Sequence, residues 1–188
     1  MAKVRSKQAP VRAKPQATRR ARMSPGATHV TGTGTNARSR MVDVGGKAAT
    51  ARRAEARVMI RFPKSDAARL VRTGGPKGPI KEIARAAAVL AAKRTSDLIP
   101  LCHPLALDSI DVTFTARGKH ALEVRCTAAC TGRTGVEMEA MVGAAIAALT
   151  VYDMTKALDH GITITDLELL EKRGGKSGLW RARSKTKA

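Results

Sequence analysis

The residue best suited to proton transfer near neutral pH is His103, which lies between two prolines in the string LIPLCHP. Proline restricts its own backbone and that of the preceding residue, so we expect the imidazole to be held in a fixed position. Imidazole titrates near neutrality without help from its surroundings and can exchange a proton with a substrate. A single histidine can equally be structural, with its ring nitrogens bonded to the protein, so both interpretations stay open.

A carboxylate and an amine form the second candidate pair. Asp153 and Lys156 are three residues apart in YDMTKALD, which places them on one face of a helix. The apolar run 140–152 precedes them and predicts that much of this helix is buried, where an ionised pair is costly. The pair is therefore either a solvated ion pair or a pair with shifted pKa values that serves proton transfer.

Basic residues near glycines form the third candidate group. Glycine lets backbone amides and nearby cations approach one phosphate together, which favours a polyphosphate ligand. A Walker loop is excluded, because its first glycine would fall on Leu170. The cations considered are Arg52, Arg53, Lys77, Lys93, Arg94, Arg133, Lys172, Arg173 and Lys176.

The sequence predicts neither a metal nor another cofactor, and it predicts a cytoplasmic protein. Cys102, Cys126 and Cys130 lack metal-site spacing, and their odd number leaves one free thiol under any pairing, which is typical of a reducing compartment. No N-terminal apolar run of signal-peptide length is present. The 13-residue apolar run 140–152 is shorter than the roughly 20 residues that span a bilayer.

Positive charge is concentrated at the two ends of the 188-residue chain. Residues 1–40 carry ten Lys or Arg and 172–188 carry seven, without any acidic residue. Removing these from the net charge of +20 leaves +3 for residues 41–171. Residues 1–40 also show no hydrophobic period. We therefore predict a disordered basic arm over 1–40, one catalytic domain over 41–178 and a basic C-terminal tail over 179–188.

Hydrophobic periodicity predicts the elements that position these candidates. Alternation of apolar and polar residues predicts strands at 58–62, 110–114, 122–128 and 162–170, with a hairpin over 109–131. A short helix is expected from an N-cap at Ser65 to Gly74-Gly75. A second helix is expected from Pro79, with an apolar stripe formed by Ile80, Ile83, Ala84, Ala87, Leu90 and Ala91.

A long helix is expected between the third and fourth strands. Thr134 and Glu137 have capping-box spacing at its start, and it should end near His160-Gly161. The resulting order is strand, helices, strand, strand, helix, strand. This order predicts an α+β fold, the ferredoxin-like split βαβ arrangement, with an antiparallel sheet and helices packed on one face.

Six strings in this order resemble the cyclic pyranopterin monophosphate synthase family, the accessory protein C of molybdenum cofactor biosynthesis. They are MVDVGGK, KGP, AAKRTSDLIPLCHPL, TGRTGVEMEAM, ALTVYDMTKALD and LLEKRGGKSG, and the resemblance spans about residues 41–178. It implies a lyase that converts 3′,8-cyclo-7,8-dihydroguanosine 5′-triphosphate to cyclic pyranopterin monophosphate and releases diphosphate. It also implies the ferredoxin-like fold.

The resemblance further implies a set of site residues and an assembly. Asp153, Lys156 and Lys77 match catalytic positions. The positions that match substrate-binding residues are Leu101, Cys102, His103, Met138, Glu139, Arg52 and Lys172. The family assembly implied is a homohexamer, a trimer of dimers, with sites at subunit interfaces, so that Lys77 and Asp153 of one site could come from different chains.

Two other functions are compatible with parts of the sequence. A nucleic-acid-binding protein could act through the basic termini, but residues 41–171 are nearly neutral and the chain has only four aromatic residues, whereas a binding domain is expected to carry a basic face. A Schiff-base lyase could use Lys156 as its nucleophile, and borohydride trapping would detect it. Acid-base chemistry on an anionic small molecule remains the favoured interpretation.

Overall fold

The computed structural model describes residues 30–31 and 34–183. Four long strands form one antiparallel sheet, in the order β4-β5-β3-β6, and the short strand β7 extends it beyond β6. The strands are β3 (Thr50–Arg61), β4 (Ser109–Ala116), β5 (Ala121–Gly132), β6 (Thr163–Arg173) and β7 (Trp180–Arg181).

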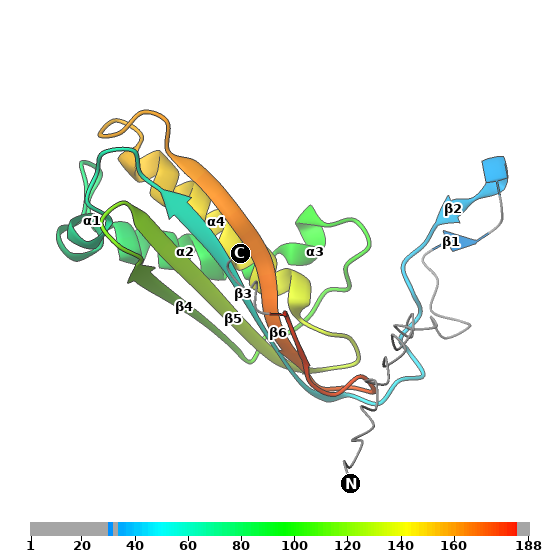
Figure 1. Cartoon of the computed structure of the whole chain (residues 1–188). Coiled ribbons are helices and arrows are strands. Elements are labelled where there is room, and N and C mark those ends of the chain that lie inside the picture. Colours follow the sequence, from blue (N-terminus) through cyan, green and yellow to red (C-terminus); the bar gives the residue numbers. More distant parts are fainter. Residues whose placement is uncertain (1–29, 32–33, 184–188) are drawn as a thin grey trace, which may run out of the picture.

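Two long helices cover one face of this sheet (Figure 1). The two long helices are α2 (Ile80–Lys93) and α4 (Glu137–Thr155), and two short helices are α1 (Ala67–Thr73) and α3 (Thr95–Leu98). Together, α2 and α4 form the helical layer, and α4 packs against β3, β5 and β6. The first long strand, β3, therefore lies at the centre of the sheet between β5 and β6, and the predicted split βαβ arrangement is confirmed.

Short strands also lie near the two ends of the described chain. Val30–Thr31 (β1) pairs with Arg38–Ser39 (β2) around the 3-10 helix Gly34–Asn36 (η1), so part of the segment predicted as an arm is a two-stranded ribbon. At the other end, β7 lies within the predicted C-terminal tail. The predictions for residues 1–29, 32–33 and 184–188 lie outside the described residues.

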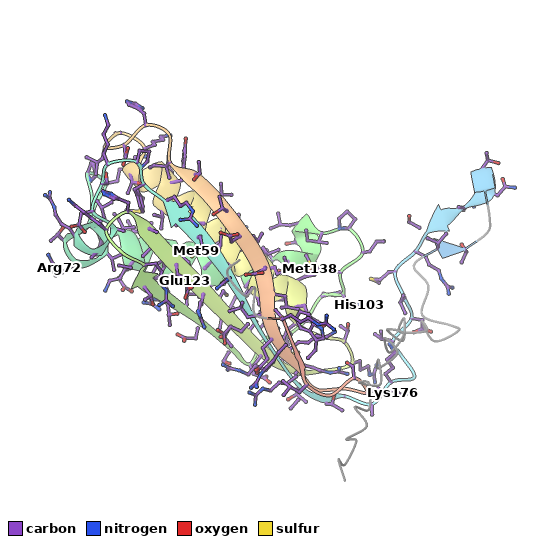
Figure 2. All side chains as sticks on the ribbon, in the orientation of Figure 1. Met59, Arg72, His103, Glu123, Met138 and Lys176 are labelled. Atoms are coloured by element: carbon purple, nitrogen blue, oxygen red, sulfur yellow. The ribbon has the colours of Figure 1, made fainter. Side chains whose placement is uncertain are left out.

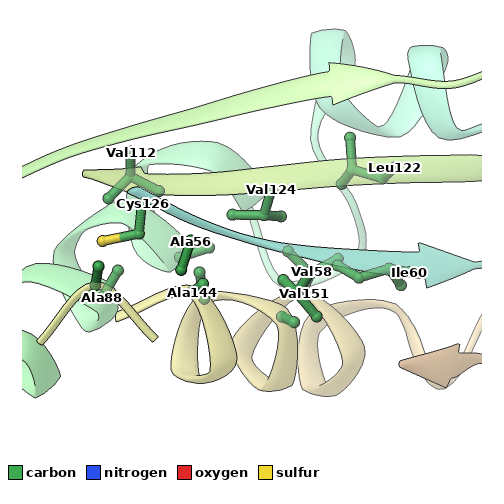
Figure 3. Packing of buried hydrophobic residues seen from close by; sticks show 14 of the residues in the cluster. Ala56, Val58, Ile60, Ala88, Val112, Leu122, Val124, Cys126, Ala144 and Val151 are labelled. Carbon is green, nitrogen blue, oxygen red and sulfur yellow. The ribbon is translucent and has the colours of Figure 1, made fainter. Parts of the chain in front are cut away.

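Alternation in the strands builds the core. Val58 and Ile60 of β3 and Leu122 and Val124 of β5 are fully or almost fully buried on the face that α4 covers, as Figure 3 shows. The helical side of this core consists mainly of alanines, so helix and sheet approach closely. Gly143 marks the tightest approach, because a Cβ there would lie 2.6 Å from the Sγ of Cys126 in β5.

Both predicted N-caps are wrong by one to a few residues. The N-cap of α1 is Asp66, whose Oδ1 accepts from the Arg69 amide at 2.9 Å, rather than Ser65. Helix α4 starts at Glu137 with no side-chain cap, so the predicted capping box with Thr134 does not form. Glu137 instead accepts a hydrogen bond from Lys172 at 2.8 Å, since an ammonium is the stronger partner for its carboxylate.

The predicted C-terminus of the long helix is also wrong, because α4 ends at Thr155 with Lys156 as its C-cap. The predicted apolar stripe of α2 is partly wrong as well. Ala84, Ala88, Ala91 and Ala92 pack inward with Ile80, whereas Ile83 and Leu90 are 42% and 53% exposed. Close packing through small residues turns the large side chains outward, where α2 presents them to solvent.

The opposite face of the sheet carries an ion-pair network centred on Glu123. This side chain is 4% exposed and accepts hydrogen bonds from Arg117 at 2.9 Å and from Arg125 at 2.6 Å. Arg57 lies 3.9 Å from its second oxygen and also pairs with Glu168. Three arginines therefore compensate one buried carboxylate, as the cost of burying an unpaired charge requires.

Candidate active site

A cluster of three charged side chains lies at the C-terminal end of α4. The Asp153 carboxylate accepts a hydrogen bond from Lys77 Nζ at 2.6 Å through Oδ2 and pairs with Lys156 Nζ at 2.9 Å through Oδ1. All three side chains are about half exposed. The structure thus brings the three residues predicted as catalytic together within one chain, and the expectation of sites at subunit interfaces stays a prediction.

The two lysines set the ionisation of this cluster. The hydrogen bonds from Lys77 and Lys156 lower the pKa of Asp153 to about 2, and the same carboxylate raises the pKa of Lys156. Asp153 is therefore ionised at neutral pH, and Lys156 is protonated. Two ammonium groups around one carboxylate leave an excess of positive charge, which is suited to an anionic ligand.

The loop that carries Lys77 is shaped by glycines and packs directly on α4. Gly75 and Gly78 exchange two backbone hydrogen bonds of 3.0 Å, and Gly74 and Gly78 both have positive φ angles. A Cβ at Gly74 would lie 2.7 Å from the carbonyl oxygen of Gly78, and one at Gly75 would lie 3.5 Å from that of Met154. The small residues bring the loop against the turn of α4 that carries Asp153.

A cavity of about 320 Å³ lies at the other end of α4. It contains five of the predicted substrate-binding residues, which come from the segment after α3 and from the first turn of α4. The complete lining consists of Val42, Val44, Lys47, Leu101, Cys102, His103, Leu105, Thr134, Gly135, Glu137, Met138 and Glu139. Figure 2 shows His103 and Met138 at the same end of the molecule, with Arg72 at the opposite end.

His103 is held in one tautomer when neutral. Its Nε2 lies 2.7 Å from the carbonyl oxygen of Val42, and a carbonyl only accepts, so Nε2 carries the hydrogen. Neutral His103 therefore has an unprotonated Nδ1 that can accept a proton. The predicted fixed orientation of this imidazole is explained by a contact with residue 42, which is 61 positions away in the chain.

Two acidic side chains in the cavity differ in their surroundings. Burial raises the pKa of Glu139, and the charge of Glu137 adds to this effect. Burial, followed by the charge of Glu139, also raises the pKa of the Cys102 thiol. Glu137 instead pairs with Lys172. The cavity thus combines a carboxyl group and a thiol whose pKa values are both raised with a second carboxyl group that contacts an ammonium.

Arg52 and Lys172, the predicted phosphate-binding cations, lie beside this cavity. Arg52 Nε and Nη2 each lie 3.4 Å from carbonyl oxygens, of Gly132 and Arg133 respectively. Gly174 and Gly175 have positive φ angles and leave no room for a Cβ beside Ala51 and Arg52. The glycines of the RGGKSG string therefore let the segment after β6 pass closely over Arg52.

The two groups of predicted site residues do not meet within one chain. Glu139 and Asp153 both lie on α4, fourteen residues apart, which at 1.5 Å per residue corresponds to about 21 Å. A single reacting ring cannot contact both ends. Within one chain, His103 therefore lies with Glu139 at the other end of α4 from Asp153.

Several lining residues were not singled out from the sequence. Lys47 and Val42 belong to the string MVDVGGK. Its Gly45-Gly46 followed by a lysine is the same pattern, glycines beside a basic residue, that pointed to Lys77. Glu137 was assigned only to a helix cap.

Among the described residues, no group of three or more His, Cys, Asp or Glu could hold a metal ion. No helix in the described part of the chain is long and apolar enough to cross a bilayer.

Comparison with known proteins gives consistent matches. A sequence model described as the MoaC family matches residues 41–175. A cyclic pyranopterin monophosphate synthase of Novosphingobium aromaticivorans is 53% identical over 156 residues, which cover 82% of this chain and 96% of the relative. Proteins of the same name from Chloroflexus aggregans and Xanthomonas oryzae are 50% and 51% identical over 77% and 76% of this chain and 88% and 87% of theirs.

Proposed function

The chain belongs to the MoaC family, as a cyclic pyranopterin monophosphate synthase of molybdenum cofactor biosynthesis, and we propose that Asp153, Lys156 and Lys77 are its catalytic residues. The observation that carries this proposal is the single carboxylate that contacts both ammonium groups, at 2.6 and 2.9 Å. Such a cluster can pass protons between its members while it keeps a net positive charge.

The substrate is 3′,8-cyclo-7,8-dihydroguanosine 5′-triphosphate. Protons move through the cluster while the purine-derived ring system opens and is rebuilt. A substrate hydroxyl oxygen then bonds to the innermost phosphorus, the bond from that phosphorus to the bridging oxygen breaks, and diphosphate leaves with the bridging oxygen. Positive charge from Lys77, Lys156, Arg52 and Lys172 stabilises the leaving group.

The complete site is formed by two copies of the chain. The half-site with Asp153 and the half-site with His103 and Glu139 are about 21 Å apart along α4, so a partner subunit must supply one of them. Tyr152 and Leu149 are exposed on α4 next to Asp153, and Ile83 and Leu90 are exposed on the adjacent α2. Large apolar side chains exposed along the helical layer favour a second copy as the covering partner.

The assembly is a homohexamer, a trimer of dimers, which repeats this contact by symmetry. It acts in the cytoplasm, in keeping with three free cysteines among the described residues. The substrate-binding half consists of Leu101, Cys102, His103, Met138, Glu139, Arg52 and Lys172.

Release of diphosphate from the cyclised triphosphate tests this function. The purified protein should release one diphosphate per substrate, and Asp153→Asn and Lys77→Met should each lower kcat by about a hundredfold or more, as losses of proton-transfer groups do. Both side chains are half exposed, so the variants should fold like the wild type by circular dichroism. Near-normal turnover in Asp153→Asn would remove the proposed catalytic role.

A further inference from the structure

Asp159 is a buried carboxylate that has no place in the site described so far. It is 3% exposed and lies in the connection between α4 and β6. Its Oδ2 accepts hydrogen bonds from the backbone amides of Lys64 and Ser65, both at 2.8 Å. Its Oδ1 is buried without a hydrogen-bond partner among the described residues. One oxygen atom therefore holds two backbone amides of a distant loop.

On the α4 side, Asp159 anchors the turn that begins with Lys156, one of the proposed catalytic residues. Lys156 is the C-cap of α4, and Ala157 and Leu158 after it are exposed. Asp159 is the first buried residue after the helix. Helix ends with few buried contacts fray readily, so the position of Lys156 depends on how firmly Asp159 is fixed.

On the other side, the bound loop begins the segment that supplies Lys77. Residues 64–65 precede Asp66, the N-cap of α1, and α1 leads directly into the loop with Gly74, Gly75 and Lys77. The 64–65 loop is itself tied to the hairpin turn, because the Ser65 carbonyl oxygen lies 3.1 Å from His120 Nδ1. Asp159 thus joins the two segments whose ends meet at the 2.6 Å contact between Lys77 and Asp153.

Resting on the proposed function, we propose that Asp159 is a positioning residue, which fixes Lys156 and Lys77 around Asp153 without touching the substrate. Burial alone would raise the pKa of Asp159, but the backbone amides of Ser65 and Lys64 outweigh this effect and hold its pKa below the ordinary value. Asp159 is therefore ionised at neutral pH, and its Oδ2 accepts both backbone hydrogen bonds as a carboxylate oxygen.

Two variants of Asp159 separate positioning from general destabilisation. Asp159→Ala removes the acceptor, and because a misplacement of about 1 Å can cost a hundredfold in rate, kcat should fall about ten- to a hundredfold. KM should change less than about threefold, because most substrate-binding groups lie at the other end of α4. Asp159→Asn keeps an oxygen for both amides, and its NH₂ group replaces an oxygen that has no partner, so kcat should stay within about threefold of the wild type.

Asp66→Ala is the matched control. It removes the carboxylate next to this loop that accepts from the backbone amide of Arg69 in α1 at 2.9 Å, but this carboxylate does not join the loop to α4. A loss of stability in the loop alone would lower the activity of Asp66→Ala and Asp159→Ala alike. The proposal requires a normal kcat in Asp66→Ala, with each rate divided by the concentration of folded protein.

Crystal structures give a readout that does not depend on activity. In Asp159→Ala, the distance from Lys77 Nζ to Asp153 Oδ2 should lengthen beyond hydrogen-bonding range or the Lys156 side chain should leave Asp153, whereas Asp159→Asn should keep both contacts. An unchanged cluster in Asp159→Ala, or equal loss of kcat in the Asn and Ala variants, would overturn the proposal. Failure of the wild type to release diphosphate would refute the proposed function instead, and the crystal structures would still decide the role of Asp159.

Discussion

Gly143 sets the distance between α4 and the sheet, so Gly143→Ala tests the packing of the helix that carries residues of both half-sites. A Cβ at this position would lie 2.6 Å from the Cys126 Sγ, 3.5 Å from the carbonyl oxygen of Ala88 and 3.6 Å from the Ala92 Cβ. Only the first distance is shorter than an ordinary contact. Cys126 points from β5 toward the helical layer (Figure 3) and is fully buried, so its sulfur has little room to move.

Overpacking of this kind costs roughly 1 to 3 kcal/mol. For a chain of this size, a loss of 1 kcal/mol lowers Tm by about 2 to 4 °C, so Gly143→Ala should lower Tm by roughly 2 to 12 °C. Alanine favours helix over glycine by up to about 1 kcal/mol, so a large overpacking cost gives a clear fall in Tm, whereas the smallest cost would be cancelled by this gain. The urea midpoint and Tm of both proteins should be compared at one protein concentration, because assembly contributes to stability.

Cys126→Ala supplies the control, because it removes the sulfur that the new methyl group would meet. Alone it should also destabilise the protein, since it leaves a small cavity. In the double variant, the methyl group introduced at position 143 occupies part of this cavity, and the combined loss should be smaller than the sum of the two single losses by about 0.5 to 2 kcal/mol. Strictly additive losses would refute the argument that Gly143 is required by the sulfur of Cys126.

The two buried carboxyl groups Glu139 and Glu123 should change the stability of the protein with opposite pH dependences, and deletion of the basic arm should leave activity unchanged. Because burial raises the pKa of Glu139, the wild type loses stability as pH rises through that pKa, so Glu139→Gln should raise the urea midpoint at pH 7.5 but not at pH 4; a uniform change would contradict this. Burial raises the pKa of Glu123, but Arg117 and Arg125 outweigh this effect and lower it, so the contribution of Glu123 to stability is present at neutral pH and is lost as the pH falls through that pKa. Glu123→Gln should cost roughly 1 to 3 kcal/mol at pH 7 and progressively less on acidification, and the reverse order would refute the network. Deleting residues 1–40, which precede the matched family segment, should leave kcat/KM within about twofold, whereas the nucleic-acid alternative requires loss of the main activity.

The strands were predictable because their burial follows local alternation. Val58 and Ile60 alternate with polar residues and fill the core of β3, and the hairpin formed by β4 and β5 follows the same rule. Helix ends were less predictable because adjacent residues compete for them. Asp66 rather than Ser65 caps α1, and Lys172, 35 positions away, takes Glu137 from the predicted capping box.

The site was only partly predictable for a different reason. Spacing placed Asp153 and Lys156 on one helical face, but the contact with Lys77 depends on a loop that returns over 76 positions. The separation of His103 from Asp153 follows from the length of α4 and from which end each segment reaches. Ile83 and Leu90 have the period of a buried stripe, yet alanines fill the interior of α2, and periodicity does not distinguish a core from a surface that a second copy would cover.

Mixing two inactive variants tests the central claim, that one site takes its two halves from two copies of the chain. Asp153→Asn lacks the catalytic half and His103→Ala lacks the binding half. Equal amounts of the two variants, unfolded and refolded together, should recover about a quarter of the wild-type rate of diphosphate release. With random pairing at a symmetric interface, about one site in four combines an intact catalytic half with an intact binding half. Each variant refolded alone should stay inactive. A mixture no more active than the two separate variants would contradict the shared site.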